Sequence, residues 1–205
     1  MTTPQAIIIL GSWGSGTTAI TGYIERLGAY SCPPHLMIED PKTPNTHESQ
    51  PFRLSLMQCV QQQTLQRTKP RSAFHNWFGE WYPKMIECAE QKNCSHIVLK
   101  HPLAGFFIPE ISEVCNPKYL LVTRPMKAIK KTRIRRNWPL FLGEGGAPKI
   151  YVQTLAELLN AGKSALMLSY PEFLASTTAR AEMRQFLNLP NSGDKMEAAE
   201  DWLRR

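Results

Sequence analysis

The stretch that most constrains the fold is a short apolar run at residues 7–10, followed at once by a glycine-rich segment at residues 11–18. Beyond it, apolar side chains recur at helical spacing as far as Leu27, and Gly28 provides a helix stop. A loop between a buried strand and a helix points backbone N–H groups and the positive end of the helix at one spot. This stretch therefore predicts a phosphate-binding turn at the edge of a sheet.

The loop has the spacing of the nucleoside-triphosphate motif G-x-x-x-x-G-K-S/T, but Thr17 stands where that motif has lysine. In such enzymes the lysine reaches the β- and γ-phosphates and the next hydroxyl binds Mg²⁺. Here the hydroxyls of Thr17 and Thr18 replace that pair. The loop is therefore expected to suit a phosphate group but not metal-assisted phosphoryl transfer.

Size, charge and cysteine usage narrow the class of protein. The 205 residues are expected to form one domain, residues 1–205, with a substantial core. A formal net charge of +7 indicates an anionic partner such as a nucleotide, a nucleic acid or a membrane surface. The five cysteines are scattered without a C-x-x-C pair, which favours reduced thiols, a cytoplasmic location and no metal centre. No run is long enough to predict a membrane span or a signal peptide.

Strand and helix patterns alternate along the rest of the chain. Apolar runs at residues 96–100, 119–123 and 165–168 predict further strands covered on both faces. Helices are expected over about residues 52–66, 72–91, 126–136, 149–160 and 178–187. Residues 31–50, rich in Pro, Thr, Asn and His, are expected to form a long loop over the active face. The alternation predicts a three-layer α/β/α fold with a mostly parallel central sheet.

Ligands in such sheets bind at the carboxyl ends of the strands, and basic residues are found there. Lys100 and His101 end one predicted strand, and Arg124 ends another. Thr132 follows Arg124 by two helical turns, so the pair can hold a second phosphate at a distance from the first loop. The six basic residues between positions 127 and 136 do not share one face, and most of them are expected to be solvated.

These segments together resemble the sulfotransferases that use 3′-phosphoadenosine-5′-phosphosulfate (PAPS). That family binds the 5′-phosphosulfate with a loop of the form G-x-x-R/K-S-G-T-S/T, which is matched here by Gly11, Ser15, Gly16, Thr17 and Thr18. It binds the 3′-phosphate with a strand-end arginine and a serine eight residues later, and Arg124 and Thr132 have that spacing. Residues 98–102, 46–48, 169–174 and 186–189 resemble further parts of the family pattern, so the likeness spans about residues 6–189.

The resemblance implies a P-loop-like sulfotransferase architecture, PAPS as cofactor and adenosine-3′,5′-bisphosphate (PAP) as product. It assigns cofactor binding to the loop and to a second site, which comprise Gly11, Ser12, Trp13, Gly14, Ser15, Gly16, Thr17, Thr18, Arg124 and Thr132. Lys100 would contact the transferring group. Glu48 is the favoured general base because the family's acidic residue falls there, and His47 and His101 are further catalytic candidates. The resemblance implies no metal.

The sequence departs from the family pattern at two places. Gly14 stands where the family has a basic residue, and Lys100 at a neighbouring strand end is the candidate to supply that charge. The family's C-terminal G-x-x-R/K-x-G element is absent, so the adenosine must be held by other residues. The nearby candidates are Arg133, Arg135, Arg136 and Trp138.

Three alternatives to an active sulfotransferase remain open at this stage. One is a related protein that binds the nucleotide with little or no turnover, because of Gly14. Another is a P-loop nucleotide kinase, against which Thr17 and the lack of an acidic residue ending an early strand both count. The third is a nucleic-acid-binding module built on residues 127–136, although no recognition motif accompanies them. The acceptor (a small alcohol or phenol, a carbohydrate or a peptide side chain) and the oligomeric state cannot be read from the sequence.

Overall fold

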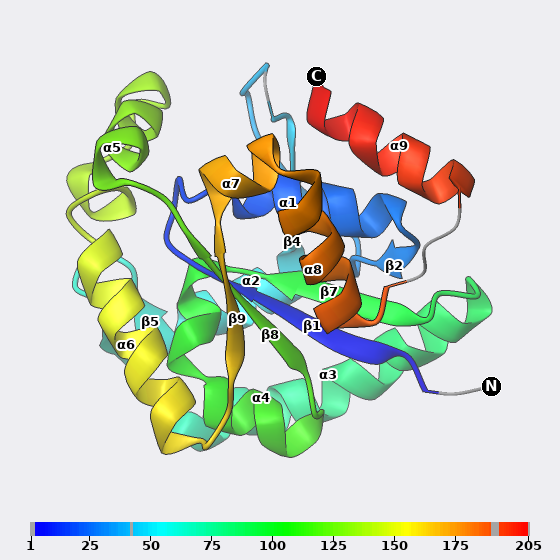
Figure 1. The fold of residues 1–205 in the computed structure, drawn as a ribbon. Coiled ribbons are helices and arrows are strands. Elements are labelled where there is room, and N and C mark those ends of the chain that lie inside the picture. The colour runs from blue at the N-terminus through cyan, green and yellow to red at the C-terminus, as the bar shows by residue number, and fades with distance from the viewer. Residues whose placement is uncertain (1–2, 42, 190–192, 205) are drawn as a thin grey trace.

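A computed structural model of the chain describes residues 3–41, 43–189 and 193–204. Its centre is a parallel sheet of five strands in the order β2-β7-β1-β8-β9 (Figure 1). The strands are β1 (Gln5–Leu10), β2 (Ala29–Tyr30), β7 (His96–Lys100), β8 (Lys118–Thr123) and β9 (Ala165–Ser169). The predicted parallel sheet is therefore confirmed, with the strand that leads into the glycine-rich loop at its middle.

Strand β1 is apolar throughout because it is covered on both faces. Ile8 and Leu10 pack into one core with helices below the sheet in Figure 1, whereas Ile7 and Ile9 pack into the core on the opposite face. The first core is covered by α2 (Gln50–Cys59), α3 (Arg71–Gln91), α4 (Ile108–Val114) and α6 (Ala147–Asn160). The second is covered by α1 (Thr17–Arg26), α8 (Thr177–Leu187) and α9 (Gly193–Arg204). This arrangement confirms the three-layer α/β/α prediction.

The remaining elements follow the carboxyl ends of the strands. Two short 3₁₀ helices are η1 (Pro102–Phe106) after β7 and η2 (Leu140–Leu142). Helix α5 (Met126–Arg135) follows β8, and α7 (Tyr170–Ala175) follows β9. No helix in the described ranges has the length and apolar character that crossing a membrane requires.

Two predicted segments differ in the structure. Residues 31–50 are not one long loop, because they hold β3 (His35–Met37) and β4 (Asn45–Ser49), which form an antiparallel hairpin. The helix expected to reach residue 66 ends at Cys59 and is followed by a second hairpin, β5 (Val60–Gln61) with β6 (Gln66–Arg67). The strands of both hairpins are five residues long or shorter, and β4 and β6 contain no apolar residue, so neither hairpin has the apolar alternation that predicts a strand.

Candidate functional site

A cleft of about 590 Å³ opens at the carboxyl ends of the central strands. The phosphate loop forms its floor, and its walls come from β4, α5, α7 and α9, which are far apart in the sequence. Residues of the cleft that bear on function are Trp13, Gly14, Gly16, Thr17, Thr18, Thr46, Glu48, Arg53, Lys100, Arg124, Thr132, Arg135, Arg136, Trp138, Tyr170 and Trp202. The fold therefore gathers the residues of both predicted phosphate sites, together with Glu48 and Lys100, around one space.

The glycine-rich loop divides into a supporting part and a part that faces the cleft. Gly11, Ser12 and Ser15 lie beneath the surface, where the Ser15 hydroxyl and N–H both donate to the Ser12 carbonyl, at 2.7 and 3.2 Å. Gly16 has φ +102°, and a Cβ there would overlap the ring of Tyr170. Only glycine lets the chain turn at this point with the tyrosine in place.

The rest of the loop presents backbone donors to the cleft. Five backbone N–H groups of the loop donate no hydrogen bond to any described residue. They belong to Trp13, Gly14, Gly16, Thr17 and Thr18. They lie at the start of α1, where the helix dipole adds partial positive charge. Free amides grouped at a helix N-terminus have the geometry and the partial positive charge that suit an anion.

Beside the loop, Lys100 at the end of β7 forms a buried ion pair with Glu48 of β4. The Lys100 Nζ lies 2.9 Å from Glu48 Oε1 and donates to the Thr18 hydroxyl at 3.0 Å. Only 3% of Lys100 and 8% of Glu48 is exposed, so water screens the pair weakly. Burial lowers the pKa of the Lys100 ammonium, and the negative charge of Glu48 offsets part of this shift by raising it. Burial alone would raise the pKa of Glu48, but the charge of Lys100, with those of His101 and Arg53, holds it below its usual value.

On the other side of the loop, Arg124 and Thr132 come together as predicted. The Arg124 Nη1 donates to the Thr132 hydroxyl at 3.0 Å and to the Gly14 carbonyl at 2.9 Å. The guanidinium lies over the Tyr170 ring, 5.0 Å from its centroid. The arginine is therefore oriented by three parts of the chain, namely the glycine-rich loop, α5 and α7, and its other N–H groups make no hydrogen bond to any described residue.

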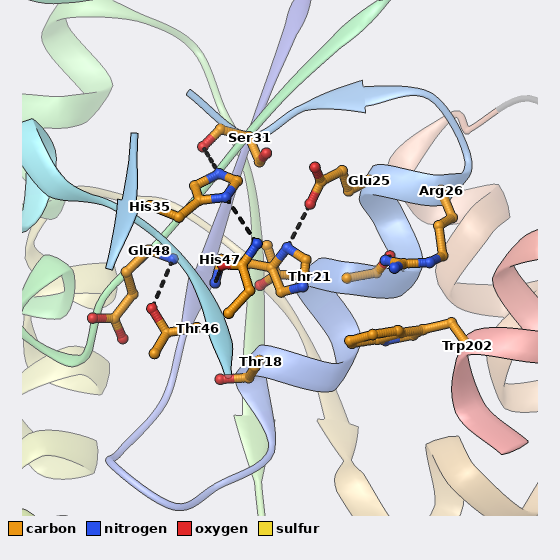
Figure 2. A network of polar contacts seen from close by, with 12 residues as sticks. Thr18, Thr21, Glu25, Arg26, Ser31, His35, Thr46, His47, Glu48 and Trp202 are labelled. Atoms are coloured by element: carbon orange, nitrogen blue, oxygen red, sulfur yellow. Dashed lines mark hydrogen bonds and ion pairs between the residues drawn. The ribbon is translucent and has the colours of Figure 1, made fainter. Parts of the chain in front are cut away.

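The two histidines predicted as catalytic candidates both lie outside the cleft lining. His47 is turned away from the cleft, and its ring contacts Glu25 of α1 (Figure 2). His101 is buried, and its Nδ1 accepts the Leu103 N–H at the start of η1. Burial lowers the pKa of His101 to about 4, so the ring is neutral at pH 7. In this arrangement Glu48 is the candidate base that faces the cleft.

The candidates for holding an adenosine are divided between the cleft and the surface. Arg133 pairs with Glu144 at 2.8 Å outside the cleft. Arg135 and Arg136 line the cleft and bind the buried carboxylate of Asp40 at 2.8 and 2.7 Å. Arg136 also lies over the ring of Trp138, a further lining residue, 4.7 Å from its centroid.

Some residues of the site were not found by sequence reasoning. Asp40 pairs with Arg135 and Arg136 from a segment expected to be loop, and nothing in the local pattern signals these partners. Tyr170 belongs to a segment that resembled the family pattern, but its position over Gly16 and Arg124 follows from the tertiary fold. Trp202 reaches the cleft from α9, and its spacing from Met196 and Ala199 is the helical signal that was available.

Comparisons with known proteins support the fold. No family model matches the chain, and no curated protein matches it. Among solved structures, the sulfotransferase domain from the Synechococcus PCC 7002 olefin synthase is similar, with a TM-score of 0.53 at 14% identity, over 97% of this chain and 81% of that one. At that identity the likeness concerns the fold alone. The chain has a sulfotransferase-like fold.

Proposed function

We propose that the protein transfers a sulfuryl group from PAPS to a hydroxyl or amine acceptor. The observation that carries the proposal is that one cleft holds two groups of hydrogen-bond donors whose chemistry suits anions. One is the set of free loop amides, and the other is Arg124 with Thr132. The fold that this chain shares with a sulfotransferase domain adds support.

The residues present fit such a cofactor, which carries a phosphosulfate at one end and a 3′-phosphate on its ribose. The amides of Trp13, Gly14, Gly16, Thr17 and Thr18 suit the first group because they donate to no described residue and lie at the start of helix α1. Arg124 suits the second because a guanidinium can donate two parallel hydrogen bonds to a phosphate. Arg136 and Trp138 lie in the same cleft, where they can stack on a base.

When bound, PAPS would supply an activated sulfuryl group: an acceptor oxygen or nitrogen would bond to its sulfur while the bond from sulfur to the bridging phosphate oxygen breaks, and PAP would leave. For the protein's part, Glu48 is a carboxylate at neutral pH and can take the proton that the acceptor loses. Lys100 and Thr18 hold positive charge and a hydroxyl beside the loop, where negative charge grows on the leaving oxygen. The walls of the cleft orient the two reactants.

Gly14 limits how much of this charge the loop itself provides. It has φ +77°, and its carbonyl is held by Arg124. Where the resembling family has a basic side chain in the loop, this chain has none, so we assign that role to Lys100, which reaches the loop at the Thr18 hydroxyl. A protein that binds the nucleotide without turnover is therefore the second candidate.

The test is calorimetric titration of PAP into the protein, with AMP and Mg·ATP as competing ligands. We expect micromolar binding of PAP that requires its 3′-phosphate. Arg124→Ala should weaken PAP binding roughly 10- to 100-fold, because a charge-assisted hydrogen bond contributes about 1.5–3 kcal/mol, and should leave AMP binding unchanged. Lys131→Ala is the matched control, since it removes the same charge from an exposed position on α5 outside the cleft.

The outcomes separate the candidate functions. PAP binding followed by sulfuryl transfer to any acceptor in a screen supports the enzyme, and PAP binding without transfer supports the inactive relative. Tighter binding of Mg·ATP than of PAP would point to a kinase instead. Binding of polynucleotides that weakens steeply with salt, without PAP binding, would point to a nucleic-acid-binding module.

A further inference from the structure

The strand that carries the proposed base is irregular. In the β3–β4 hairpin His35 lies opposite Ser49, and the next aligned pair is Met37 with Asn45. Three residues of β4, at positions 46–48, therefore face a single residue of β3. Extra residues of this kind form a β-bulge, which bends the strand and changes the direction of its side chains.

His47 lies at the centre of this bulge with a strained backbone. Its φ is +53°, in the left-handed backbone region that residues other than glycine rarely adopt. Such a conformation persists only where the surrounding structure holds it. Here the His47 N–H donates to Asn45 Oδ1 at 2.8 Å, and the Glu48 N–H donates to the Thr46 hydroxyl at 3.3 Å.

The ring of His47 is fixed to helix α1. Its Nδ1 donates to Glu25 Oε2 at 2.5 Å, and its edge packs against the Trp202 ring with centroids 5.4 Å apart. The ring is buried, and its Nε2 has no hydrogen-bond partner in the described part of the chain. Glu25 is therefore the one polar attachment that this side chain has there.

On the opposite side of the strand, Glu48 points into the cleft (Figure 2). Its partner Lys100 is also held by Thr18, at the start of α1. Glu25 lies two turns further along the same helix. Helix α1 is thus linked to both members of the buried pair. Its Thr18 binds Lys100 directly, and its Glu25 binds His47, the residue next to Glu48.

We propose that Glu25 and His47 are positioning residues, which hold the bulge in β4 so that Glu48 reaches Lys100 and stays in the cleft. The consequence for catalysis rests on the proposed function, because it takes Glu48 as the base. The structural part does not, since it concerns how the Glu48–Lys100 pair is assembled.

A double-mutant cycle tests the structural part without any cofactor. The measured quantity is the folding equilibrium constant from chemical denaturation at pH 7. In the native background Glu48→Gln should lower it at least 100-fold. In a His47→Ala background, where the pair is not held together, Glu48→Gln should lower it less than tenfold. His47→Asn should restore the large effect, because asparagine tolerates the left-handed backbone and keeps a donor near the position of Nδ1.

The matched control is His75→Ala, which removes a histidine from a surface pair with Glu113 at 3.2 Å. There Glu48→Gln should keep its full 100-fold effect. An equally large effect in the His47→Ala background would overturn the proposal, since His47 would then act on stability alone. If His47→Ala does not fold, the cycle is repeated in a Glu25→Gln background. An effect of Glu48→Gln that stays at 100-fold in that background would likewise overturn the proposal.

Catalysis gives the second readout, which separates this proposal from the proposed function. His47→Ala should lower kcat by at least tenfold and change PAP affinity by less than about threefold, because the loop amides and Arg124 are unaltered; His47→Asn should recover most of kcat. A tenfold loss of PAP affinity in His47→Ala would mean that the residue supports the loop rather than Glu48. If the native protein binds no PAP, the proposed function fails, while the cycle still decides how the pair is held.

Discussion

Replacing Glu48 by Gln should destabilise the protein strongly at pH 7 and much less at pH 9. The change keeps the size of the side chain but leaves the Lys100 ammonium without its counter-charge in a site where the lysine is 3% exposed. Breaking a buried ion pair by removing one partner costs about 3–5 kcal/mol, because the remaining charge stays desolvated.

The loss has an upper limit set by proton release. Instead of staying charged, Lys100 can lose its proton. Its pKa in the unfolded chain is about 10.4, and deprotonation costs about 1.4 kcal/mol for each pH unit below that value, which is about 4.6 kcal/mol at pH 7. The folded-state pKa in the variant falls further below the unfolded one, so the unfolded chain binds more protons between them. Stability therefore rises with pH, and at pH 9 the limit on the loss is about 1.9 kcal/mol.

Lys100→Met should show the opposite pH dependence. It leaves the Glu48 carboxylate buried, with Arg53 4.0 Å away as its nearest remaining cation. The pKa of that carboxyl then rises above its unfolded value, so stability is lost at pH 7 and recovers on acidification toward pH 5. The double variant removes both charges and should lie within about 2 kcal/mol of the native protein, because replacing a whole buried pair costs little.

Guanidinium denaturation followed by tryptophan fluorescence at pH 5, 7 and 9 measures all four proteins. The decisive result is the crossing of the two single variants, with Glu48→Gln the more stable at pH 9 and Lys100→Met the more stable at pH 5. Losses below about 1 kcal/mol in both, with parallel pH profiles, would refute the reasoning. That behaviour is typical of an exposed pair that water screens. Glu48 would then not hold the Lys100 ammonium in a fixed position beside the loop.

Two further predictions concern the floor of the cleft and its neighbour. Gly16→Ala should lower the thermal midpoint clearly more than Gly14→Ala does. Both glycines have positive φ, but an added Cβ overlaps the Tyr170 ring only at Gly16, and at Gly14 its nearest contact is an ordinary 3.5 Å. His101→Asn should keep the acceptor for the Leu103 N–H and remove a group whose pKa burial lowers from about 6.5 to about 4. Between those values the unfolded chain binds more protons, so the native protein should lose about 3 kcal/mol relative to this variant as denaturation is measured from pH 7 down to pH 4.

The sequence was sufficient for the elements whose stability comes from apolar burial. The strands around residues 7–10, 96–100, 119–123 and 165–168 are confirmed, because continuous apolar runs have few alternatives to a covered parallel sheet. The helices expected over about residues 72–91, 126–136, 149–160 and 178–187 are confirmed to within a few residues. Three α-helices, α4, α7 and α9, were not predicted. Helix α4 is short, and α9 carries a narrow apolar stripe among many charged residues.

The polar hairpin was missed, and it carries much of the site. Strand β4 reads Asn-Thr-His-Glu-Ser, and four of its five residues are buried although none is apolar. Their burial is balanced by partners that lie elsewhere in the chain, such as Glu25 for His47 and Lys100 for Glu48. Hydrophobic periodicity cannot report such pairs, since each depends on which segments the sheet brings together. Resemblance to a family pattern pointed to Glu48, but the ion pair follows from the structure alone.

The order of the strands determines which side of the cleft each proposed ligand would occupy. Strand β1 lies between β7 and β8, so the loop that follows it has Lys100 on one side and Arg124 on the other. Both contacts reach the loop at different places, Lys100 at the Thr18 hydroxyl and Arg124 at the Gly14 carbonyl. Under the proposed function the 3′-phosphate belongs to the Arg124 side. The acceptor must then approach from the side of Lys100, because Glu48, the base that faces the cleft, is paired there. Enlarging a side chain of the β3–β4 hairpin that lines the cleft should therefore impair acceptor use more than PAP binding.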